Sequence, residues 1–471
     1  MYQPLLVGGQ WVPTPHVRTL YAPYTRTPLA EVAYATPDHI QQVIAQLSVG
    51  QKAAAQLPTH QRYTILDRLA RWISDNAEAI ARGIAEEAGK PLRYARAEVQ
   101  RAYITVTLGR DLVRLIEGEL LPGDLSPATE GRWLLVRRMP LGPLLAITPF
   151  NFPLNLVLHK IVPAIVAGCA ITLKPAPQAP LTAYRVGTAL LEAGWPPEAL
   201  SIISAEPAVA EILVRSPAYR ILSFTGSAAV GWHLQTLAVQ KKVILELGGS
   251  AAVIVHDTED LSKAAQAIAE AAYLYAGQVC IAVQRIFVHR SLYDDFLEAY
   301  RAATYALVCG DPLHEETHLS SIIDERNFRR ITDWLTEARL SGAHELIPPV
   351  LDPERRLITP GLLSELSPNI HLAQEEAFAP LAEIAPYDLP EEAFQKVNSS
   401  PYGLQAGIYT ASERLLRQAF EYLEVGGLIH NAPPTLRIDS MPYGGMKNSG
   451  LGREGVKYAF LEYTVPKVLV W

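Results

Sequence analysis

The sequence predicts an α/β protein whose strands form parallel, doubly wound sheets. The first observation is that, from Gly142 onward, short apolar segments alternate regularly with segments of helical pattern. The second is that a further series of the same kind begins at Ala251. Such alternation is typical of parallel strands joined by crossover helices. With 471 residues, of which 49% are hydrophobic, the chain is long enough for two or three structural units with a large core.

The segment before Gly142 has a different pattern. Residues 1–10 read as an edge strand that enters a turn, and residues 38–118 carry helical periodicity, with apolar side chains repeating every three or four positions. A Pro-Gly-Asp turn signal then ends the helical pattern. Segments 119–121 and 133–138 on either side of it read as the two strands of a hairpin that extends from the body.

The alternating part of the chain divides into two series. The first contains the predicted strands Leu144–Thr148, Ala170–Lys174, Leu200–Ile203, Ile221–Phe224 and Lys242–Leu245, with helices at Leu154–Ala167 and Leu181–Glu192. The second contains the predicted strands Ala251–Val255 and Arg285–His289, with helices at Leu261–Tyr275 and 291–305. The boundary between the two units falls near Glu246–Gly249. The absence of a long linker predicts that the units are tightly docked.

Composition excludes several classes of function. The formal charge of −7 and a pI near 6.0 argue against a nucleic-acid-binding protein. No apolar run approaches the roughly 18–20 residues of a membrane span, and the N-terminus lacks the pattern of a secretory signal. Three cysteines do not suggest a disulfide framework, so a cytoplasmic location is expected. No Cys/His cluster has metal-ligand spacing, and no metal is predicted.

Cys280, in a Gly-Gln-x-Cys setting, is the first candidate catalytic residue. Glu246 lies 34 positions upstream in a Leu-Glu-Leu-Gly-Gly run. A thiol and a carboxylate in two such contexts suggest covalent catalysis, in which the thiolate attacks an electrophilic carbon and the carboxylate moves protons or activates water. A lone cysteine is more often a small buried hydrophobe. The catalytic interpretation is favoured only because independent motifs point to the same chemistry.

Two glycine motifs compete as cofactor sites. Gly450–Gly455 matches G-x-G-x-x-G, but it does not close an apolar strand and too few residues follow it for a βαβ unit, so we reject it. Phe224–Ser227 follows a strand and opens a helix. There Gly226 allows close backbone approach, and Ser227 can cap the helix while donating to a phosphate. An ordinary N-cap remains the alternative.

Polar residues also follow two neighbouring predicted strands. The segment Thr148–Pro153 lies at the carboxyl end of one strand, where open α/β sheets place ligands. Its Asn151 amide can donate to an oxyanion that forms near the thiol. Lys174 ends the next strand in a similar place. Either side chain could instead be a polar residue that merely closes a strand.

Seven motifs in this order resemble the NAD(P)-dependent aldehyde dehydrogenase superfamily, and the resemblance runs from end to end of the chain. They are Thr148–Pro153, Lys174-Pro175, Phe224–Ser227, Glu246–Gly249, Gly277–Cys280, Glu375–Pro380, and Pro442–Lys447 continuing to Gly450–Gly455. The resemblance implies a Rossmann-like NAD(P)-binding domain (1–118 and 141–246) and an α/β catalytic domain (247–440). It also implies a β-hairpin oligomerisation arm (119–140 and 463–471) that builds a homodimer or homotetramer, with the C-terminal strand joining a partner's sheet.

The resemblance also implies the mechanism. Cys280 attacks the aldehyde carbon, and the Asn151 amide and the Cys280 backbone N–H stabilise the oxyanion. Hydride then passes to the cofactor, and Glu246 activates the water that hydrolyses the thioester. Lys160 and Glu454 match positions that relay a proton from Glu246. The presence of Glu246 favours hydrolysis to a free acid over transfer to CoA.

The cofactor residues follow from the same motifs. They are Thr148, Phe150, Lys174, Pro177, Phe224, Gly226, Ser227, Leu247, Glu376 and Phe378. Ala379 stands where the family has Gly, so this position must take negative φ. Pro177 stands where NAD-preferring members often have Glu, which repels a 2′-phosphate. NADP is therefore not excluded, and use of both NAD and NADP is predicted.

The substrate residues implied are Phe152, His159 and Arg437. A His and an Arg suit a small hydroxylated or anionic aldehyde, because a charge-assisted contact would orient it. The pattern is similar to the lactaldehyde, phosphonoacetaldehyde and non-phosphorylating glyceraldehyde-phosphate dehydrogenase branches. A solvated Arg and a structural His remain the alternative.

The function predicted is irreversible oxidation of a small polar aldehyde to its acid. A broad detoxifying dehydrogenase is the nearest alternative. A thiol esterase without redox chemistry is a second alternative, in which the cofactor residues would have no role. A non-catalytic binding protein on this scaffold is a third, in which the catalytic residues would have no role.

Overall fold

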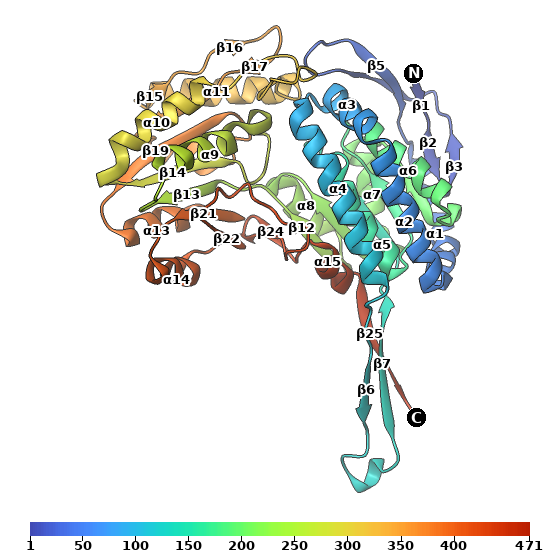
Figure 1. The fold of residues 1–471 in the computed structure, drawn as a ribbon. Helices are drawn as coiled ribbons and strands as arrows, with labels where there is room; N and C mark the ends of the chain where they lie inside the picture. Colours follow the sequence, from blue (N-terminus) through green and yellow to red (C-terminus); the bar gives the residue numbers. More distant parts are fainter.

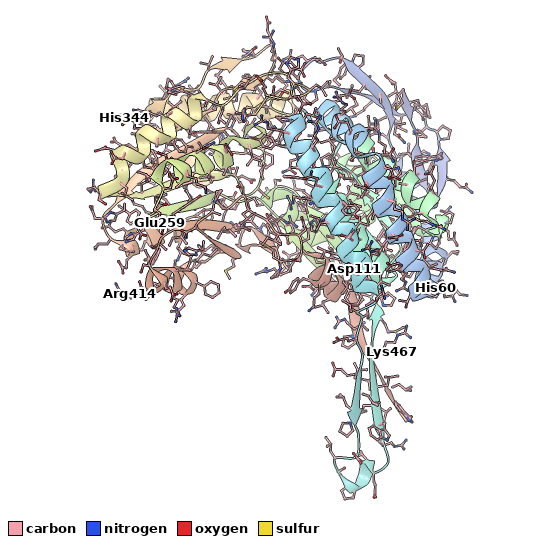
Figure 2. The ribbon with its side chains drawn as sticks, viewed as in Figure 1. His60, Asp111, Glu259, His344, Arg414 and Lys467 are labelled. Carbon is pink, nitrogen blue, oxygen red and sulfur yellow. The ribbon has the colours of Figure 1, made fainter.

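The computed structural model describes residues 1–471 and contains two α/β lobes side by side, with a long β arm projecting from one of them (Figure 1). One lobe is built on an eight-stranded sheet and the other on a seven-stranded sheet. The predicted α/β class is therefore confirmed. Exposed polar side chains point outward over both lobes and the arm, as Figure 2 shows for His60, Asp111, Glu259, His344, Arg414 and Lys467.

The eight-stranded sheet has the order β24-β12-β11-β8-β9-β10-β2-β3, and its five central strands are parallel. Those strands are β8 (Leu144–Ile147), β9 (Ile171–Lys174), β10 (Leu200–Ile202), β11 (Ile221–Thr225) and β12 (Lys242–Glu246). Their side chains are almost all buried, because helices cover both faces of a parallel sheet. The N-terminal hairpin β2 (Leu5–Val7) and β3 (Gln10–Val12) closes one edge. The predicted turn is found there, but β2 pairs with both β10 and β3, so the edge strand is β3. A small separate sheet combines β1 (Tyr2–Gln3), β4 (Val17–Tyr21) and β5 (Pro28–Ala33).

Eight helices belong to this lobe. They are α1 (Pro37–Gln56), α2 (Thr59–Asp75), α3 (Ala77–Ala88), α4 (Leu92–Val113), α5 (Asn155–Ala167), α6 (Leu181–Ala193), α7 (Pro207–Arg215) and α8 (Ala228–Leu237). All 13 residues of α5 are buried, because α4 and the C-terminal helix pack against it from outside the sheet. A helix that is apolar on all sides belongs in a core. Its sequence therefore carries no information on which face meets a ligand.

The seven-stranded sheet has the order β15-β18-β19-β14-β13-β21-β22. Its strands are β13 (Ala251–Val255), β14 (Val283–His289), β15 (His344–Ile347), β18 (Gly361–Ser364), β19 (Leu381–Tyr387), β21 (Gln405–Tyr409) and β22 (Gly427–His430). Its helices are α9 (Leu261–Tyr273), α10 (Tyr293–Tyr305), α11 (Glu325–Leu340), α12 (His371–Gln374), α13 (Pro390–Asn398) and α14 (Glu413–Tyr422). Short strand pairs are β16 (Leu351–Asp352) with β17 (Leu357–Ile358), and β20 (Tyr402–Gly403) with β23 (Met446–Lys447).

The chain then returns to the first lobe. Strand β24 (Gly450–Leu451) pairs with β12, and α15 (Val456–Glu462) packs on α5. The two sheets are thus joined by two crossings, one at 247–250 and one after β22. The first crossing lies at the predicted boundary, whereas the second was not predicted. The roles assigned to residues 1–118 with 141–246 and to residues 247–440 stay predictions.

The arm is a three-stranded antiparallel sheet of β6 (Glu119–Pro122), β7 (Trp133–Pro140) and β25 (Thr464–Val470). Strand β25 pairs along its whole length with β7 of the same chain, from Thr464 opposite Pro140 to Val470 opposite Leu134. The other edge of β25 has no strand against it. Its joining of a partner's sheet stays a prediction.

Candidate active site

A strained turn places Cys280 between the two sheets. After α9 the chain passes through Tyr275, Ala276 and Gly277 with φ of 50°, 53° and 67°, a left-handed run that L-residues rarely adopt. A Cβ on Gly277 would lie 2.0 Å from the Ala379 carbonyl oxygen. The Tyr275 hydroxyl fixes the turn by donating to the Ala88 carbonyl at 2.6 Å. Strain of this kind persists only where the surroundings enforce it, and it gathers at functional sites.

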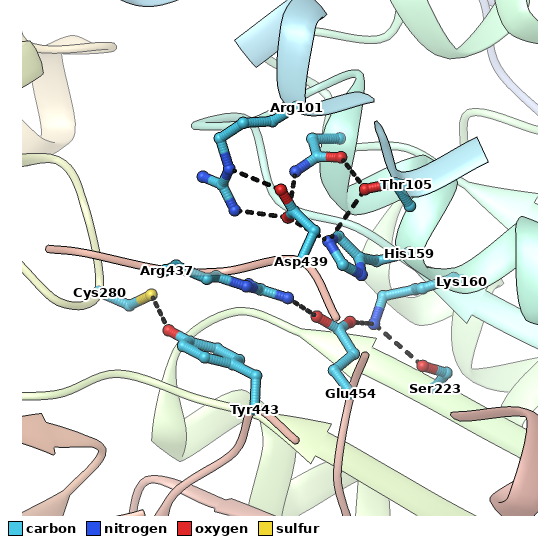
Figure 3. Close-up of polar contacts among 11 residues, drawn as sticks. Arg101, Thr105, His159, Lys160, Ser223, Cys280, Arg437, Asp439, Tyr443 and Glu454 are labelled. Carbon is cyan, nitrogen blue, oxygen red and sulfur yellow. Dashed lines mark hydrogen bonds and ion pairs between the residues drawn. The ribbon is translucent and has the colours of Figure 1, made fainter. Parts of the chain in front are cut away.

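The Cys280 thiol faces an aromatic hydroxyl. Its Sγ lies 3.2 Å from the Tyr443 hydroxyl oxygen, and the Arg437 guanidinium stacks over the Tyr443 ring at 3.7 Å (Figure 3). Burial raises the pKa of the Cys280 thiol to about 12, while the Tyr443 hydrogen bond and the Arg437 charge act to lower it. The thiol is therefore protonated in this state, and forming the thiolate requires further positive charge nearby.

Glu246 ends strand β12 and has no polar partner. Both of its carboxyl oxygens are buried and make no hydrogen bond. Burial, and then the charge of Glu454, raise the pKa of Glu246 well above its usual range. A carboxyl group with a raised pKa and unused oxygens is suited to exchanging protons with water.

Behind these groups lies a chain of buried charges (Figure 3). The Lys160 ammonium donates to Glu454 Oε1 and to Ser223 Oγ, both at 3.0 Å, and Arg437 donates to Glu454 Oε2 at 3.0 Å. Burial alone would raise the pKa of Glu454, but Lys160 and Arg437 lower it to about 2. Lys160 and Glu454, predicted as a relay, are thus in direct contact.

Asn151 lies beside the thiol with one amide hydrogen unused. Its Nδ2 donates to the Gln278 carbonyl at 3.0 Å, and the side chain is buried. Because an amide nitrogen has two hydrogens, the second can donate to an oxyanion on a substrate bound to Cys280. The Gln278 side chain holds this segment by accepting from the Ile323 N–H at 2.9 Å.

A cleft of about 640 Å³ runs between the lobes and includes Asn151, Glu246 and Cys280 in its wall. All ten residues predicted to bind the cofactor line it, at the ends of β8, β9 and β11 and on the loops facing them. They are Thr148, Phe150, Lys174, Pro177, Phe224, Gly226, Ser227, Leu247, Glu376 and Phe378. The cleft lies at the carboxyl edge of the sheet, where α/β proteins bind ligands.

Comparison with known proteins decides the family. A family model for the aldehyde dehydrogenase family matches residues 11–469. The chain belongs to the aldehyde dehydrogenase family. It is 37% identical over 467 residues to 3-sulfolactaldehyde dehydrogenase of Priestia megaterium, covering 99% of this chain and 97% of that protein.

Two solved structures have the same fold. Aldehyde dehydrogenase 21 of Physcomitrella patens, in complex with the reaction product succinate, superposes with a TM-score of 0.96 at 35% identity, covering 100% of this chain and 98% of that one. NADP-dependent glyceraldehyde-3-phosphate dehydrogenase of Bacillus halodurans, complexed with NADP, gives a TM-score of 0.96 at 31% identity, covering 100% and 99%. As an aldehyde dehydrogenase, this protein is an NAD(P)-dependent oxidoreductase. No helix has the length and hydropathy needed to cross a membrane.

The cleft of this aldehyde dehydrogenase fits a dinucleotide. Burial lowers the pKa of Lys174 to about 8, and its ammonium makes only a 3.4 Å contact with the Pro175 carbonyl, which leaves donors for a ligand. Burial raises the pKa of Glu376 to about 7, and Gly249 N–H holds one carboxyl oxygen at 3.1 Å. A Cβ on Gly248 would lie 2.2 Å from the other oxygen, so only glycine fits there.

Of two predictions at the cofactor residues, the one for Ser227 is wrong and the one for Ala379 is confirmed. Ser227 stands at the N-cap of α8, but its hydroxyl makes no capping hydrogen bond, so the predicted capping role is wrong and the hydroxyl is free for a ligand. Ala379 does take negative φ, and the left-handed residue of this loop is Phe378, at φ 48°. Phe378 packs edge-on against Phe150, with 6.0 Å between ring centroids.

The structure corrects the predicted role of His159. Its side chain is completely buried, lies outside the cleft lining and shares a proton with Asp439 Oδ1 at 3.0 Å. Arg101 holds the same carboxylate at 2.7 Å. Burial and the Arg437 charge lower the pKa of His159. His159 therefore belongs to the buried network, and Leu156 is the α5 side chain that lines the cleft.

The other predicted residues lie differently. Phe152 lies outside the cleft lining but packs in the apolar cluster that contains Cys280, with the Lys90 ammonium 3.5 Å from its ring centre. Gly450 and Gly452 pack against β12, Gly455 packs against the Met441 backbone, and none of the three lines the cleft. Residues missed from the sequence are the cleft-lining Asn327, Arg330, Trp334 and Tyr402, and Tyr443 against the thiol. Only Tyr443 lay within a recognised motif.

Proposed function

We propose that this aldehyde dehydrogenase oxidises a small polar or anionic aldehyde to the free acid. The observation that carries this proposal is the position of a buried cation, Arg437, near the thiol. Its guanidinium stacks on the Tyr443 ring, whose hydroxyl oxygen lies 3.2 Å from Cys280 Sγ. Arg437 and Lys160 both pair with the single carboxylate of Glu454. Two buried cations that share one carboxylate favour a further anion.

The known relatives support the same substrate class. Proteins that match this chain include 3-sulfolactaldehyde and sulfoacetaldehyde dehydrogenases, whose named substrates carry a sulfonate. The Physcomitrella patens structure holds succinate, a dicarboxylate. Arg437 does not line the cleft, but it stacks on the ring whose hydroxyl touches the Cys280 thiol, so its charge can act on such a group without direct contact.

In the mechanism, NAD(P)⁺ supplies the hydride acceptor and a positive charge. When it is bound, Lys174 and Ser227 would donate to its polar groups, Glu376 would accept from a ribose hydroxyl, and Phe150 and Phe378 would form an apolar wall. Cys280 passes its proton to the Glu246 carboxylate, which releases it to solvent in the cleft, and the thiolate attacks the carbonyl carbon. The second Asn151 amide hydrogen and the Cys280 backbone N–H stabilise the resulting oxyanion.

The second half of the reaction belongs to Glu246. After hydride has left the substrate carbon, an acyl group remains on Cys280 as a thioester. Ionised Glu246 takes a proton from water, and the hydroxide so formed attacks the acyl carbon and releases Cys280. The proton then leaves Glu246 for solvent past the Lys160–Glu454 pair, in which Lys160 and Arg437 hold Glu454 as a carboxylate.

A matched pair of aldehydes tests the substrate class. Succinic semialdehyde and butanal have the same chain length, but only the first carries a carboxylate. We expect succinic semialdehyde to be favoured in kcat/KM by about tenfold or more, or about 1.4 kcal/mol of transition-state discrimination. In Arg437→Gln this ratio should fall towards one. Equal rates in the wild type, or a preference for hexanal, would show a broad detoxifying enzyme.

We also infer that the arm assembles a homodimer or homotetramer. Apolar side chains on the arm are exposed, including Leu120, Trp133 and Val468 at 60%, 48% and 53%. The outer edge of β25 is free, and an exposed strand edge is a site for pairing with another chain. Pairing of β25 with a partner's sheet would cover both the exposed apolar side chains of the arm and the free edge of β25.

A further inference from the structure

A second hollow meets the cofactor cleft at Pro177 and Gln178. It has a volume of about 260 Å³ and is otherwise lined by the small N-terminal sheet, including Arg18 and Tyr34. Pro177 and Gln178 line both spaces. The Ala35 N–H, just beyond β5, donates to the Ser204 carbonyl at 2.8 Å, which holds this sheet against the loop between β10 and α7. The N-terminal sheet therefore forms part of the wall at this end of the cleft.

Arg18 and Glu206 form an ion pair at this junction. Arg18 Nη2 lies 2.5 Å from Glu206 Oε1, and the guanidinium stacks over the Tyr34 ring at 5.2 Å. The two side chains are 62% and 41% exposed. An ion pair this exposed contributes little to stability, so a ligand anion can replace Glu206 as the partner of Arg18 at small cost. Glu206 directly precedes Pro207, which lines the cofactor cleft together with Lys174, and the Glu206 charge acts to raise the pKa of Lys174.

The order of strands shows which part of a dinucleotide reaches this junction. Hydride transfer fixes the nicotinamide end beside Cys280 and Glu246, at the end of β12. Lys174 ends β9, three strands away in the order β12-β11-β8-β9, or about 14 Å at the usual strand spacing. The adenosine end therefore lies between α7 and α8, where Ala210, Val214 and Leu234 provide an apolar slot. Its ribose then lies beside Lys174 and Pro177.

We propose that the Arg18–Glu206 pair selects the coenzyme: Arg18 binds the 2′-phosphate of NADP, and Glu206 competes with that phosphate for Arg18. With NAD, the ion pair stays closed and Glu206 faces the ribose 2′-hydroxyl. With NADP, Arg18 moves to the phosphate and Glu206 turns to water. This inference rests on the proposed use of the cleft for the coenzyme, and it explains how both coenzymes fit although position 177 is a proline.

Binding of two small nucleotides to the resting enzyme tests the proposal without turnover. Adenosine 2′,5′-bisphosphate carries the 2′-phosphate, whereas ADP lacks it, and calorimetry gives both dissociation constants. We expect Arg18→Gln to weaken binding of the bisphosphate about tenfold and ADP less than twofold, because one charge-assisted contact is lost. Glu206→Gln should strengthen bisphosphate binding about threefold by removing the competing charge. The NADP/NAD ratio of kcat/KM should move in the same directions.

Arg290→Gln is the matched control, because Arg290 is also an exposed arginine in an ion pair, with Asp388, and neither residue lines either space. It should leave both affinities unchanged. Equal changes for the two nucleotides in Arg18→Gln, or no change in either, would overturn the role of Arg18. If the wild type binds neither nucleotide, the cleft does not bind the coenzyme as proposed, and the role of the Arg18–Glu206 pair is overturned as well.

Discussion

Cys280 and Cys309 are both partly accessible thiols, and burial raises the pKa of each, to about 12 and about 11. Reactivity therefore depends on position more than on intrinsic acidity. Cys280 lies in the wall of the cleft with a hydroxyl at 3.2 Å, whereas Cys309 lies outside the cleft. The nucleophile is distinguished by what surrounds it, because a thiol needs a bound cation nearby before it ionises at neutral pH.

Replacing Cys280 with alanine should abolish aldehyde oxidation while leaving binding of ADP unchanged. The reason is that no other group can form the acyl intermediate. Near-ultraviolet absorbance of reduced coenzyme measures the first effect, and calorimetry measures the second. Cys309→Ala is the control and should retain full activity. Turnover above background in Cys280→Ala would show that Cys280 is not the nucleophile.

Glu246 should control the acid limb of the pH profile. Water activation needs the ionised carboxylate, and its raised pKa means that this form is lost at a higher pH than for an ordinary glutamate. We expect kcat to fall with decreasing pH through that raised pKa. In Glu246→Gln the limb should vanish, and a rapid burst of reduced coenzyme should precede turnover that is slower by about 10²–10³-fold.

Stopped-flow absorbance resolves the burst from steady turnover in that experiment. Glu259→Gln is the control, because Glu259 is an exposed carboxylate far from the network (Figure 2). It should change neither the burst nor the pH profile. An unaltered acid limb in Glu246→Gln would assign the titration to another group.

At the scale of elements, the left-handed turn before Cys280 ties backbone strain to function. Gly277→Ala should destabilise the fold by at least about 2 kcal/mol, because the new Cβ meets the Ala379 carbonyl oxygen and φ is positive. It should also lower kcat strongly by displacing Cys280. Thermal denaturation and initial rates measure the two effects.

Gly342→Ala provides the comparison for that turn. Gly342 has φ 89° with no atom within 4 Å of an added Cβ, so only the conformational cost of about 1 kcal/mol applies. Activity should be unchanged. If Gly277→Ala behaves like Gly342→Ala, the turn does not position the thiol.

Helix α5 shows why some of the site could not be predicted from the sequence. The segment Leu154–Ala167 was predicted within one residue, because its composition and the strands around it are distinctive. The direction in which the His159 side chain points was not predicted, because periodicity identifies a face only when one side of a helix meets water. All of α5 is buried, so spacing from Asn151 carried no information on which side the cleft lies.

Contacts between segments far apart in the chain are the second reason why part of the site could not be predicted from the sequence. The ends of β8, β9, β11 and β12 were predicted within one residue, and parallel strands bring these carboxyl ends to one edge. Arg330 reaches the cleft from α11, Arg18 lines the adjoining hollow from the N-terminal sheet, and no local pattern marks either residue. Such residues become visible only when the two lobes are placed together.

At the scale of the whole molecule, the arm cannot bury its apolar side chains within a single chain. It is a three-stranded sheet that stands away from both lobes, and its C-terminal strand leaves four consecutive apolar side chains half exposed, Val468, Leu469, Val470 and Trp471. A projecting sheet with a free edge is an aggregation hazard unless another chain covers it. The seven-stranded sheet also ends in an unpaired edge at β22.

Substituting Val468 and Val470 with glutamate should therefore separate the subunits. The two side chains lie on one face of β25, and burying two carboxylates in an apolar interface costs several kcal/mol. We expect sedimentation to show a dimer or tetramer for the wild type and a monomer for the double variant. Leu340→Glu, at an exposed site on α11, is the control and should keep the wild-type mass. An unchanged mass in the double variant would show that β25 is not the interface, and a monomeric wild type would show that the arm has another role.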